Sequence, residues 1–182
     1  MEGTTPRTYE QSGVDYGSLD PFKIAAQRAA GQPAVHLRRH GREYSEVSES
    51  RGESAFVWDE GDRYGAMVVE GLGTKNLVAD AMREITGKTY YDAIGQDAAA
   101  MIINDLITVG ATPKVIGAHF SVADAAWFKD RERSNDLVRG FRDACHAARV
   151  TWGGGETPAL KGILQPGVIE LSGSATGEIK PK

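Results

Sequence analysis

The chain has 182 residues, enough for one sizeable domain, and its apolar and charged fractions of 41% and 25% are ordinary for a globular protein. The net charge of -4 argues against a general nucleic-acid binder, which usually carries a basic face. A single cysteine, Cys145, excludes an internal disulfide. Neither a secretory signal nor a run of ~20 apolar residues is visible, so we expect a cytoplasmic protein without a membrane partner.

The first third of the chain carries weak structural signals. Residues 1 to about 20 are polar, and a helix is expected over residues 21–30, where Pro21 suits a first helical turn. Residues 31–54 hold a run of basic and then acidic side chains, which is typical of a solvated, mobile loop, although a loop that orders over a phosphorylated ligand is the alternative. We therefore expect an N-terminal segment over residues 1–54 and a domain over residues 55–182.

From residue 55 the pattern alternates between strands and helices. Strands are expected over residues 55–58, 64–69, 114–120, 150–152 and 168–176, and helices over residues 77–85, 92–109 and 135–148. Gly87 and Gly110 are placed to end the first two of these helices. The mixture predicts an α+β or α/β domain in which helices cover a mixed sheet.

The first candidate site follows the second strand, at Glu70-Gly71-Leu72-Gly73-Thr74-Lys75. Glycines in a strand-to-helix turn let backbone N–H groups approach phosphate oxygens, while Thr74 and Lys75 add a hydroxyl and a positive charge. Glu70 can bind a hard cation, which prefers oxygen ligands. The segment lacks the P-loop spacing, and a tight turn with a surface lysine is the alternative.

The second candidate lies on the long apolar helix, where Asp97 and Asn104 fall on nearly one face and Asp105 is close to it. A buried aspartate needs a partner or a metal. Asp97 and Asp105 are ~12 Å apart along the helix axis, too far for one magnesium to bind both. They must therefore serve different ligands, or one is structural; a polar stripe facing solvent is the alternative.

The third candidate is the run Gly153-Gly154-Gly155-Glu156-Thr157, which is expected to form a loop directly after a strand. Glu156 and Thr157 are plausible ligands for magnesium or a ribose, and a flexible turn is the alternative. His119, at the end of another expected strand, can act as an acid or base near neutral pH, although a lone histidine is more often structural.

Together these motifs are far more specific than any one alone. The chain resembles the N-terminal half of the phosphoribosylformylglycinamidine cyclo-ligase family, also called aminoimidazole ribonucleotide synthetase, over nearly its whole length. The resemblance is carried, in the family's order and spacing, by residues 8–15, 71–75, 96–106 and 154–157. Thiamine monophosphate kinase and selenophosphate synthetase share the superfamily fold. Residues 9–15 favour the cyclo-ligase, and a selenophosphate synthetase would show a reactive cysteine near its N-terminus.

The resemblance implies an ATP site with Mg²⁺, a small phosphorylated substrate, and a homodimer in which two sheets close into a barrel. By the same resemblance, Glu70 and Asp105 hold the metal and Lys75 meets phosphate. Together with His119, which is proposed for its acid–base chemistry, Lys75 and Asp105 are the catalytic candidates. The nucleotide-binding set is Gly71, Gly73, Thr74, Lys75, Asp97, Asn104, Gly155, Glu156 and Thr157.

The sequence departs from the family pattern at four places. The family has an aspartate at Glu70, a glycine-rich segment at residues 50–53, and a second glutamate where residues 158–161 read Pro-Ala-Leu-Lys. An aspartate expected near the end of the strand over residues 114–120 is replaced by Ala118, beside His119. Phosphate and metal chemistry is thus expected to be retained and the acceptor pocket altered, and the C-terminal half of the family is absent.

Three functions remain open at this point. The first is ATP-dependent closure of an imidazole ring in purine synthesis. The second is a small-molecule kinase of the same superfamily, similar to thiamine monophosphate kinase. The third is a non-catalytic nucleotide-binding dimerisation module.

Overall fold

The computed structural model describes residues 13–180 and divides the chain into two compact units, Met1–Ser45 and Glu46–Lys182. This division falls between Ser45 and Glu46. Of the segment 8–15 that carries part of the family resemblance, residues 8–12 lie outside the described part of the chain.

The first unit contains the helix α1 (Tyr16–Gly31) and the 3-10 helix η2 (Gln32–Arg39). Asp15 caps α1, because its side chain accepts a hydrogen bond of 2.9 Å from the backbone N–H of Gly17. The expected start at Pro21 is therefore wrong, and this proline lies inside the helix. The expected loop over residues 31–54 is also wrong in part, since it contains η2 and the short η3 (Ser48–Ser50).

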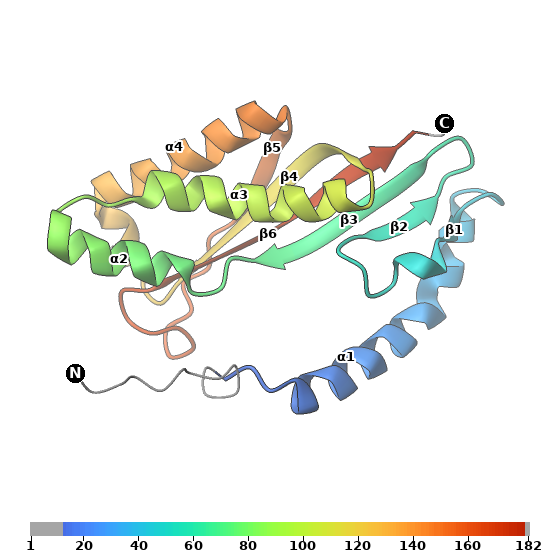
Figure 1. Ribbon diagram of the computed structural model, residues 1–182, viewed down its shortest axis with the longest axis horizontal. Helices are drawn as coiled ribbons and strands as arrows, with labels where there is room; N and C mark the ends of the chain where they lie inside the picture. The colour runs from blue at the N-terminus through green and yellow to red at the C-terminus, as the bar shows by residue number, and fades with distance from the viewer. Residues whose placement is uncertain (1–12, 181–182) are drawn as a thin grey trace, which may run out of the picture. The chain divides into compact units, whose positions relative to one another are not determined.

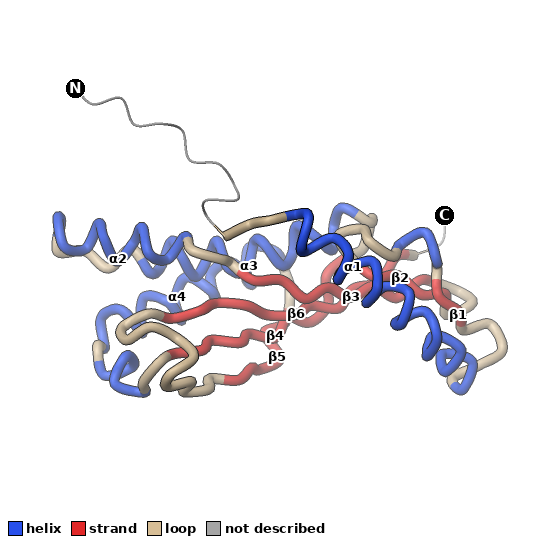
Figure 2. The backbone as a smooth tube through the Cα atoms, turned by 90° about the horizontal axis from the view of Figure 1, so that it is seen from below, coloured by secondary structure: helices blue, strands red, loops and turns tan. Residues whose placement is uncertain are grey.

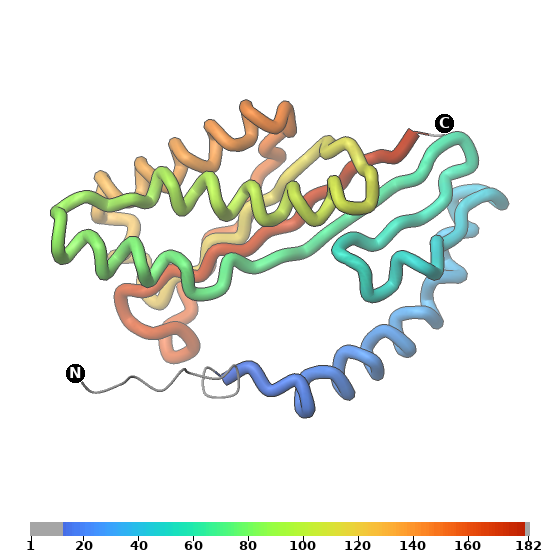
Figure 3. The backbone as a smooth tube through the Cα atoms, viewed as in Figure 1, coloured from blue at the N-terminus to red at the C-terminus, as the bar shows by residue number. Residues whose placement is uncertain are grey.

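The second unit is built on a mixed sheet with strand order β1-β2-β3-β6-β4-β5 (Figure 1). The strands are β1 (Ser45–Glu46), β2 (Phe56–Asp59), β3 (Tyr64–Gly71), β4 (Thr112–Val122), β5 (Thr151–Glu156) and β6 (Ile169–Ile179). The last strand of the chain, β6, runs antiparallel between β3 and β4, whereas β4 and β5 are parallel (Figure 3). This confirms the expected α+β class with a mixed sheet.

Three helices cover one face of this sheet: α2 (Lys75–Thr86), α3 (Tyr91–Thr108) and α4 (Arg131–Ala148). Figure 2 shows α2 and α3 along one side of the strand layer. A short 3-10 helix, η4 (Ala125–Lys129), precedes α4. Gly87 ends α2 in the left-handed conformation at φ +75°, as expected. Between residues 13 and 180, no helix has the length and apolar character needed to cross a membrane.

The core lies between the sheet and the pair α3–α4. Its largest fully buried side chains include Ile102 and Leu106 of α3, Phe141 of α4, and Leu171 of β6. The two helices approach closely because glycines lie at their contact: a Cβ on Gly140 would stand 1.8 Å from the carbonyl oxygen of Asp92. This packing fixes α3, and with it the acidic side chains that α3 carries, against the sheet.

The opposite face of the sheet, which we call the open face, carries exposed apolar side chains from two strands. Met67, Val69 and Val115 are 39%, 70% and 43% exposed, whereas Ala66 and Val68 on the helix-covered face are buried. On β6 the exposed positions Ser174 and Thr176 are polar. The period-two alternation of the strands thus separates the core from a mixed apolar and polar surface.

Candidate functional site

The turn from β3 into α2 holds the glycine-rich segment. Gly73 takes the left-handed conformation at φ +71°, which favours glycine. The turn is anchored at both ends: the N–H of Leu72 donates to the carbonyl of Leu171 at 2.7 Å, and the buried side chain of Asn76 donates to the carbonyl of Ile169 at 2.7 Å. Thr74, the N-cap of α2, makes no side-chain cap hydrogen bond, and the N–H of Leu77 donates to the carbonyl of Thr74 at 3.1 Å, which leaves the N–H groups of Lys75 and Asn76 as candidate donors to an anion.

Lys75 opens α2, and its ammonium lies 3.0 Å from the carboxylate of Asp97 on α3. Both side chains are about half exposed, so this ion pair contributes little stability. Two residues that sequence reasoning placed in the nucleotide site are therefore brought together by the packing of α2 against α3. Asn104, seven positions further along α3, is exposed.

Glu70 and Asp105 form a second pair of side chains, separate from the first. Burial raises the pKa of Asp105 above its ordinary value, and the charge and hydrogen bonding of Glu70 raise it further. Glu70 also accepts a hydrogen bond of 2.8 Å from the N–H of Gly71. A carboxylate whose ionisation is opposed by burial and by a neighbouring carboxylate gains stability from a cation shared by the two.

The third motif does not form the loop expected after a short strand, because Gly153, Gly155 and Glu156 belong to β5 itself. Pairing with β4 extends the strand: Gly155 pairs with Ala118 and Glu156 with His119. A Cβ on Gly155 would lie 2.1 Å from the carbonyl oxygen of Ala118, so the missing side chain is what allows the strands to approach. Thr157 follows the strand and is exposed.

On the open face, these strands enclose a hollow of about 500 Å³. It is lined by residues of four strands: Val69, Gly117, Ala118, His119, Gly155, Glu156, Ser172, Gly173 and Ser174. The sequence-predicted residues His119, Gly155 and Glu156 thus share one cavity. The pair Glu70–Asp105 lies on the helix-covered face and is not part of it.

His119 is held by side chains that sequence reasoning did not single out. Its Nδ1 lies 3.2 Å from the hydroxyl of Ser121 and 3.3 Å from that of Ser172. The hydroxyl of Ser172 donates to Glu170 at 3.1 Å, and Glu170 lies 3.9 Å from the ring nitrogen. The polar alternation of β6 was visible in the sequence, but its pairing with β4 was not.

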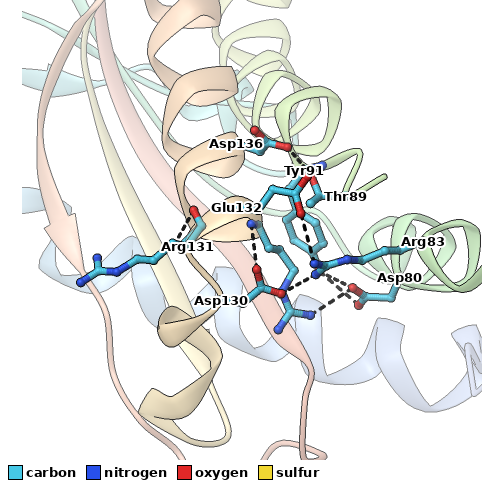
Figure 4. Close-up of polar contacts among 10 residues, drawn as sticks. Asp80, Arg83, Thr89, Tyr91, Asp130, Arg131, Glu132 and Asp136 are labelled. Atoms are coloured by element: carbon cyan, nitrogen blue, oxygen red, sulfur yellow. Dashed lines mark hydrogen bonds and ion pairs between the residues drawn. The ribbon is translucent and has the colours of Figure 1, made fainter. Parts of the chain in front are cut away.

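A second hollow, between α2 and the start of α4, is rich in charge but built as a structural network (Figure 4). Arg83 pairs with Asp130, and Arg133 lies 3.3 Å from Asp80, whose carboxylate also accepts from Tyr91. The guanidinium of Arg83 holds the pKa of Asp130 below its ordinary value. Each arginine is compensated by an aspartate, so the network ties α2 to α4 and is not a site for an anion.

Residues 52–179 match the family described as "AIR synthase related protein, N-terminal domain", and the chain belongs to this family. Among its relatives is the phosphoribosylformylglycinamidine cyclo-ligase of Methanobrevibacter smithii, 30% identical over 93% of this chain and 44% of that protein. The enzyme of the same name from Thermococcus kodakarensis is 31% identical over 96% of this chain and 48% of its own length. The chain thus spans about half the length of the curated relatives it matches.

Two solved structures share the fold at lower identity. The structure described as AaThiL complexed with AMPPCP and TMP covers 98% of this chain and 45% of its own, with a TM-score of 0.60 and 15% identity. The structure of Thermotoga maritima PurL complexed with ATP covers 74% of this chain and 23% of its own, with a TM-score of 0.51 and 16% identity. These likenesses establish the fold alone.

The family implies a metal as well as a nucleotide, and the side chains present fit a magnesium ion. Among residues 13–180, no group of three or more His, Cys, Asp or Glu side chains could hold a metal by itself. Magnesium does not require such a cage, since it usually binds through one or two carboxylates, waters and substrate phosphates. The pair Glu70–Asp105 offers those two carboxylates.

Proposed function

We propose that this chain is the ATP-binding half of an aminoimidazole ribonucleotide synthetase-type enzyme. The observation that carries the proposal is that Glu70, near the end of β3, lies beside Asp105 of α3, and that the turn into α2 follows β3 directly. Phosphates would bind at the backbone N–H groups of residues 73–76, with Lys75 as a positive charge beside them.

In this proposal, one pair of side chains contacts the phosphates of the nucleotide and another pair holds the metal. Lys75 and Asp97 form a pair that an arriving phosphate can open, because the pair is exposed and weak. Glu70 and Asp105 would hold Mg²⁺, which screens the charge of the phosphates when bound. Gly155, Glu156 and Thr157, further along the sheet, are left for the acceptor or the ribose.

The reaction proposed is the ATP-dependent cyclisation of formylglycinamidine ribonucleotide, the activity named for the cyclo-ligase relatives. ATP activates an amide oxygen and an amine then closes the imidazole ring. His119 is not part of the proposed phosphate site. It lies in the hollow where an acceptor would bind. The rival reaction within the same fold is phosphoryl transfer to a stable product, as in a thiamine monophosphate kinase-like enzyme.

We also propose that the chain forms a homodimer through the open face. Met67, Val69 and Val115 are large apolar side chains on this face, and a second copy would remove them from water. Closure of two sheets into a barrel is what the family resemblance implies. The hollow around His119 would then lie at or near the interface.

The reaction is tested by incubating the chain with ATP, Mg²⁺ and formylglycinamidine ribonucleotide and measuring ADP, free phosphate and the imidazole product. Since the chain spans about half of its relatives, the assay is repeated on a fusion to the C-terminal half of the M. smithii relative. Equal amounts of ADP, phosphate and imidazole support the cyclo-ligase. ADP without free phosphate supports a kinase, and binding of ATP without turnover in either protein supports the binding module.

A further inference from the structure

A row of residues crosses the open face from the phosphate-binding turn to the hollow. Ser172 of β6 pairs with Gly71 on one side and with His119 on the other, and His119 pairs in turn with Glu156. Neighbouring strands are ~4.8 Å apart, so Gly71 and His119 lie within about 10 Å of each other. The start of the turn and His119 are thus two strand spacings apart, and the reacting groups of a substrate would lie between them.

The contacts of Nδ1 bear on which nitrogen of the neutral His119 ring carries the proton. A carboxylate only accepts hydrogen bonds, so the hydroxyl of Ser172 donates to Glu170 at 3.1 Å. The lone pairs of that hydroxyl are then left to accept from Nδ1, 3.3 Å away. With the hydroxyl of Ser121 also accepting from Nδ1, Nδ1 carries the proton and Nε2 is an unprotonated acceptor; a Ser121 hydroxyl that donates to Nδ1 would give the opposite form.

The charge of the hollow indicates what kind of group binds there. Among the described residues that line it, none is lysine or arginine, and Glu156 is an acid. Glu170 adds a second carboxylate behind Ser172. Such a surface disfavours a phosphate or carboxylate and suits a nitrogen that donates hydrogen bonds, either neutral or cationic.

We propose that His119 is the general base that takes a proton from the attacking nitrogen of the substrate, and that Ser172 and Glu170 are positioning residues that hold its ring in the accepting form. The proposal rests on the proposed function and deepens it, since it assigns the acceptor side of the same site. Ser121, which is buried, places a second hydroxyl oxygen 3.2 Å from Nδ1.

During ring closure, the attacking nitrogen loses a proton and the activated carbon loses its phosphorylated oxygen. The nitrogen forms a bond to the activated carbon, and the carbon–oxygen bond to the phosphorylated oxygen breaks, so that phosphate leaves with the electron pair. The proton lost by the nitrogen moves to Nε2 of His119. The imidazolium that forms is stabilised through Nδ1 by Ser172 and by the carboxylate of Glu170.

The form of the ring is tested without turnover, by long-range ¹H–¹⁵N NMR of the labelled chain, with the His119 signal assigned from its loss in His119→Gln. We expect the neutral ring of His119 to carry its proton on Nδ1. Ser172→Ala should move a large share of the population to Nε2–H, whereas Ser172→Thr, which keeps the hydroxyl, should not. Ser174→Ala removes a neighbouring hydroxyl of the same hollow that does not contact His119 and should leave the ring unchanged.

The role in the reaction is tested with the assay of the proposed function. His119→Gln should lower kcat by roughly 10²–10⁴-fold, while His146→Gln on the exposed side of α4 changes nothing. Ser172→Ala should lower kcat with an unchanged KM for ATP.

The outcomes separate the two proposals. A neutral ring protonated on Nε2, or a Ser172→Ala variant with an unchanged ring, would overturn the positioning role whether or not turnover is found. A turnover that His119→Gln does not reduce would overturn the general base. Absence of ATP binding would overturn the proposed function while leaving the NMR result on the ring intact.

Discussion

Asp105 lies half-buried on α3 beside Glu70, where desolvation and a like charge both oppose its ionisation and raise its pKa. A raised pKa in the folded state means that this group favours folding below its unfolded pKa of ~3.9 and loses that contribution as pH rises through the folded pKa. At neutral pH the metal-free protein therefore carries an ionised carboxylate at a cost.

For this reason we expect Asp105→Asn to keep or raise the melting temperature at pH 7 in the absence of magnesium, and the difference from the parent to shrink towards pH 4. Thermal unfolding followed by circular dichroism at the two pH values measures this. A fall of several degrees at pH 7 would instead mark Asp105 as a structural residue, and its assignment to a metal site would fail.

Lys75 provides the second residue-scale prediction. Lys75→Ala should weaken ATP binding by roughly ten- to a hundredfold, because a charge-assisted contact contributes ~1.5–3 kcal/mol. Lys129→Ala, an exposed lysine of η4 outside the turn, is the matched control and should bind ATP like the parent. Melting curves of both variants should match the parent, since the pair Lys75–Asp97 is exposed. Equal ATP affinity in Lys75→Ala and the parent would refute the phosphate-binding role of the turn.

At the scale of elements, the pair α3–α4 depends on glycines where the two helices touch. Gly140→Ala would place a Cβ 1.8 Å from the carbonyl oxygen of Asp92, and the helices would have to separate. We expect a loss of roughly 1–3 kcal/mol in the free energy of unfolding, despite the better helix propensity of alanine. Urea unfolding checks this against Gly31→Ala, where a Cβ meets no atom within 4 Å and the change should be neutral.

Elements with strong local signals were predictable from the sequence, and those fixed by partners distant in the chain were not. The ends of α2 and α3 were predictable from Gly87 and Gly110, because each glycine stands just after the helix that it ends. The strand β5 was expected to stop at Trp152, because three glycines have low strand propensity; pairing with β4 carries it to Glu156.

The residues of the candidate site were likewise predictable where the signal is local and not where it depends on strand pairing. Sequence motifs indicated Glu70, Lys75 and Asp105, since each stands in a short pattern with its own chemistry. The surroundings of His119 could not be predicted, because Ser172 lies 53 positions away in the chain and reaches the ring only through strand pairing. Local sequence patterns thus identify turns that could bind phosphate. An acceptor pocket assembled from several strands can be recognised only once the fold is known.

For the whole molecule, the open face is the surface that decides the oligomeric state. Val69→Lys should convert a dimer to a monomer, because Val69 is 70% exposed on this face and a charge there opposes burial. Val78→Lys is a closely matched control, since Val78 on α2 is 63% exposed but lies away from the sheet. Light scattering at micromolar concentration measures both. A parent chain that is strictly monomeric, or dissociation by Val78→Lys alone, would contradict a dimer through the open face.

The account as a whole depends on a nucleotide site that needs magnesium and the carboxylates of Glu70 and Asp105. Isothermal titration of the chain with ATP, with Mg²⁺ and with EDTA, tests it most directly. We expect binding that EDTA abolishes and that Glu70→Gln and Asp105→Asn each weaken at least about tenfold, the scale of one contact to a charged group. Asp143→Asn, on the exposed side of α4, should bind like the parent. Affinity for ATP that is unchanged by EDTA and by both site variants would contradict the account.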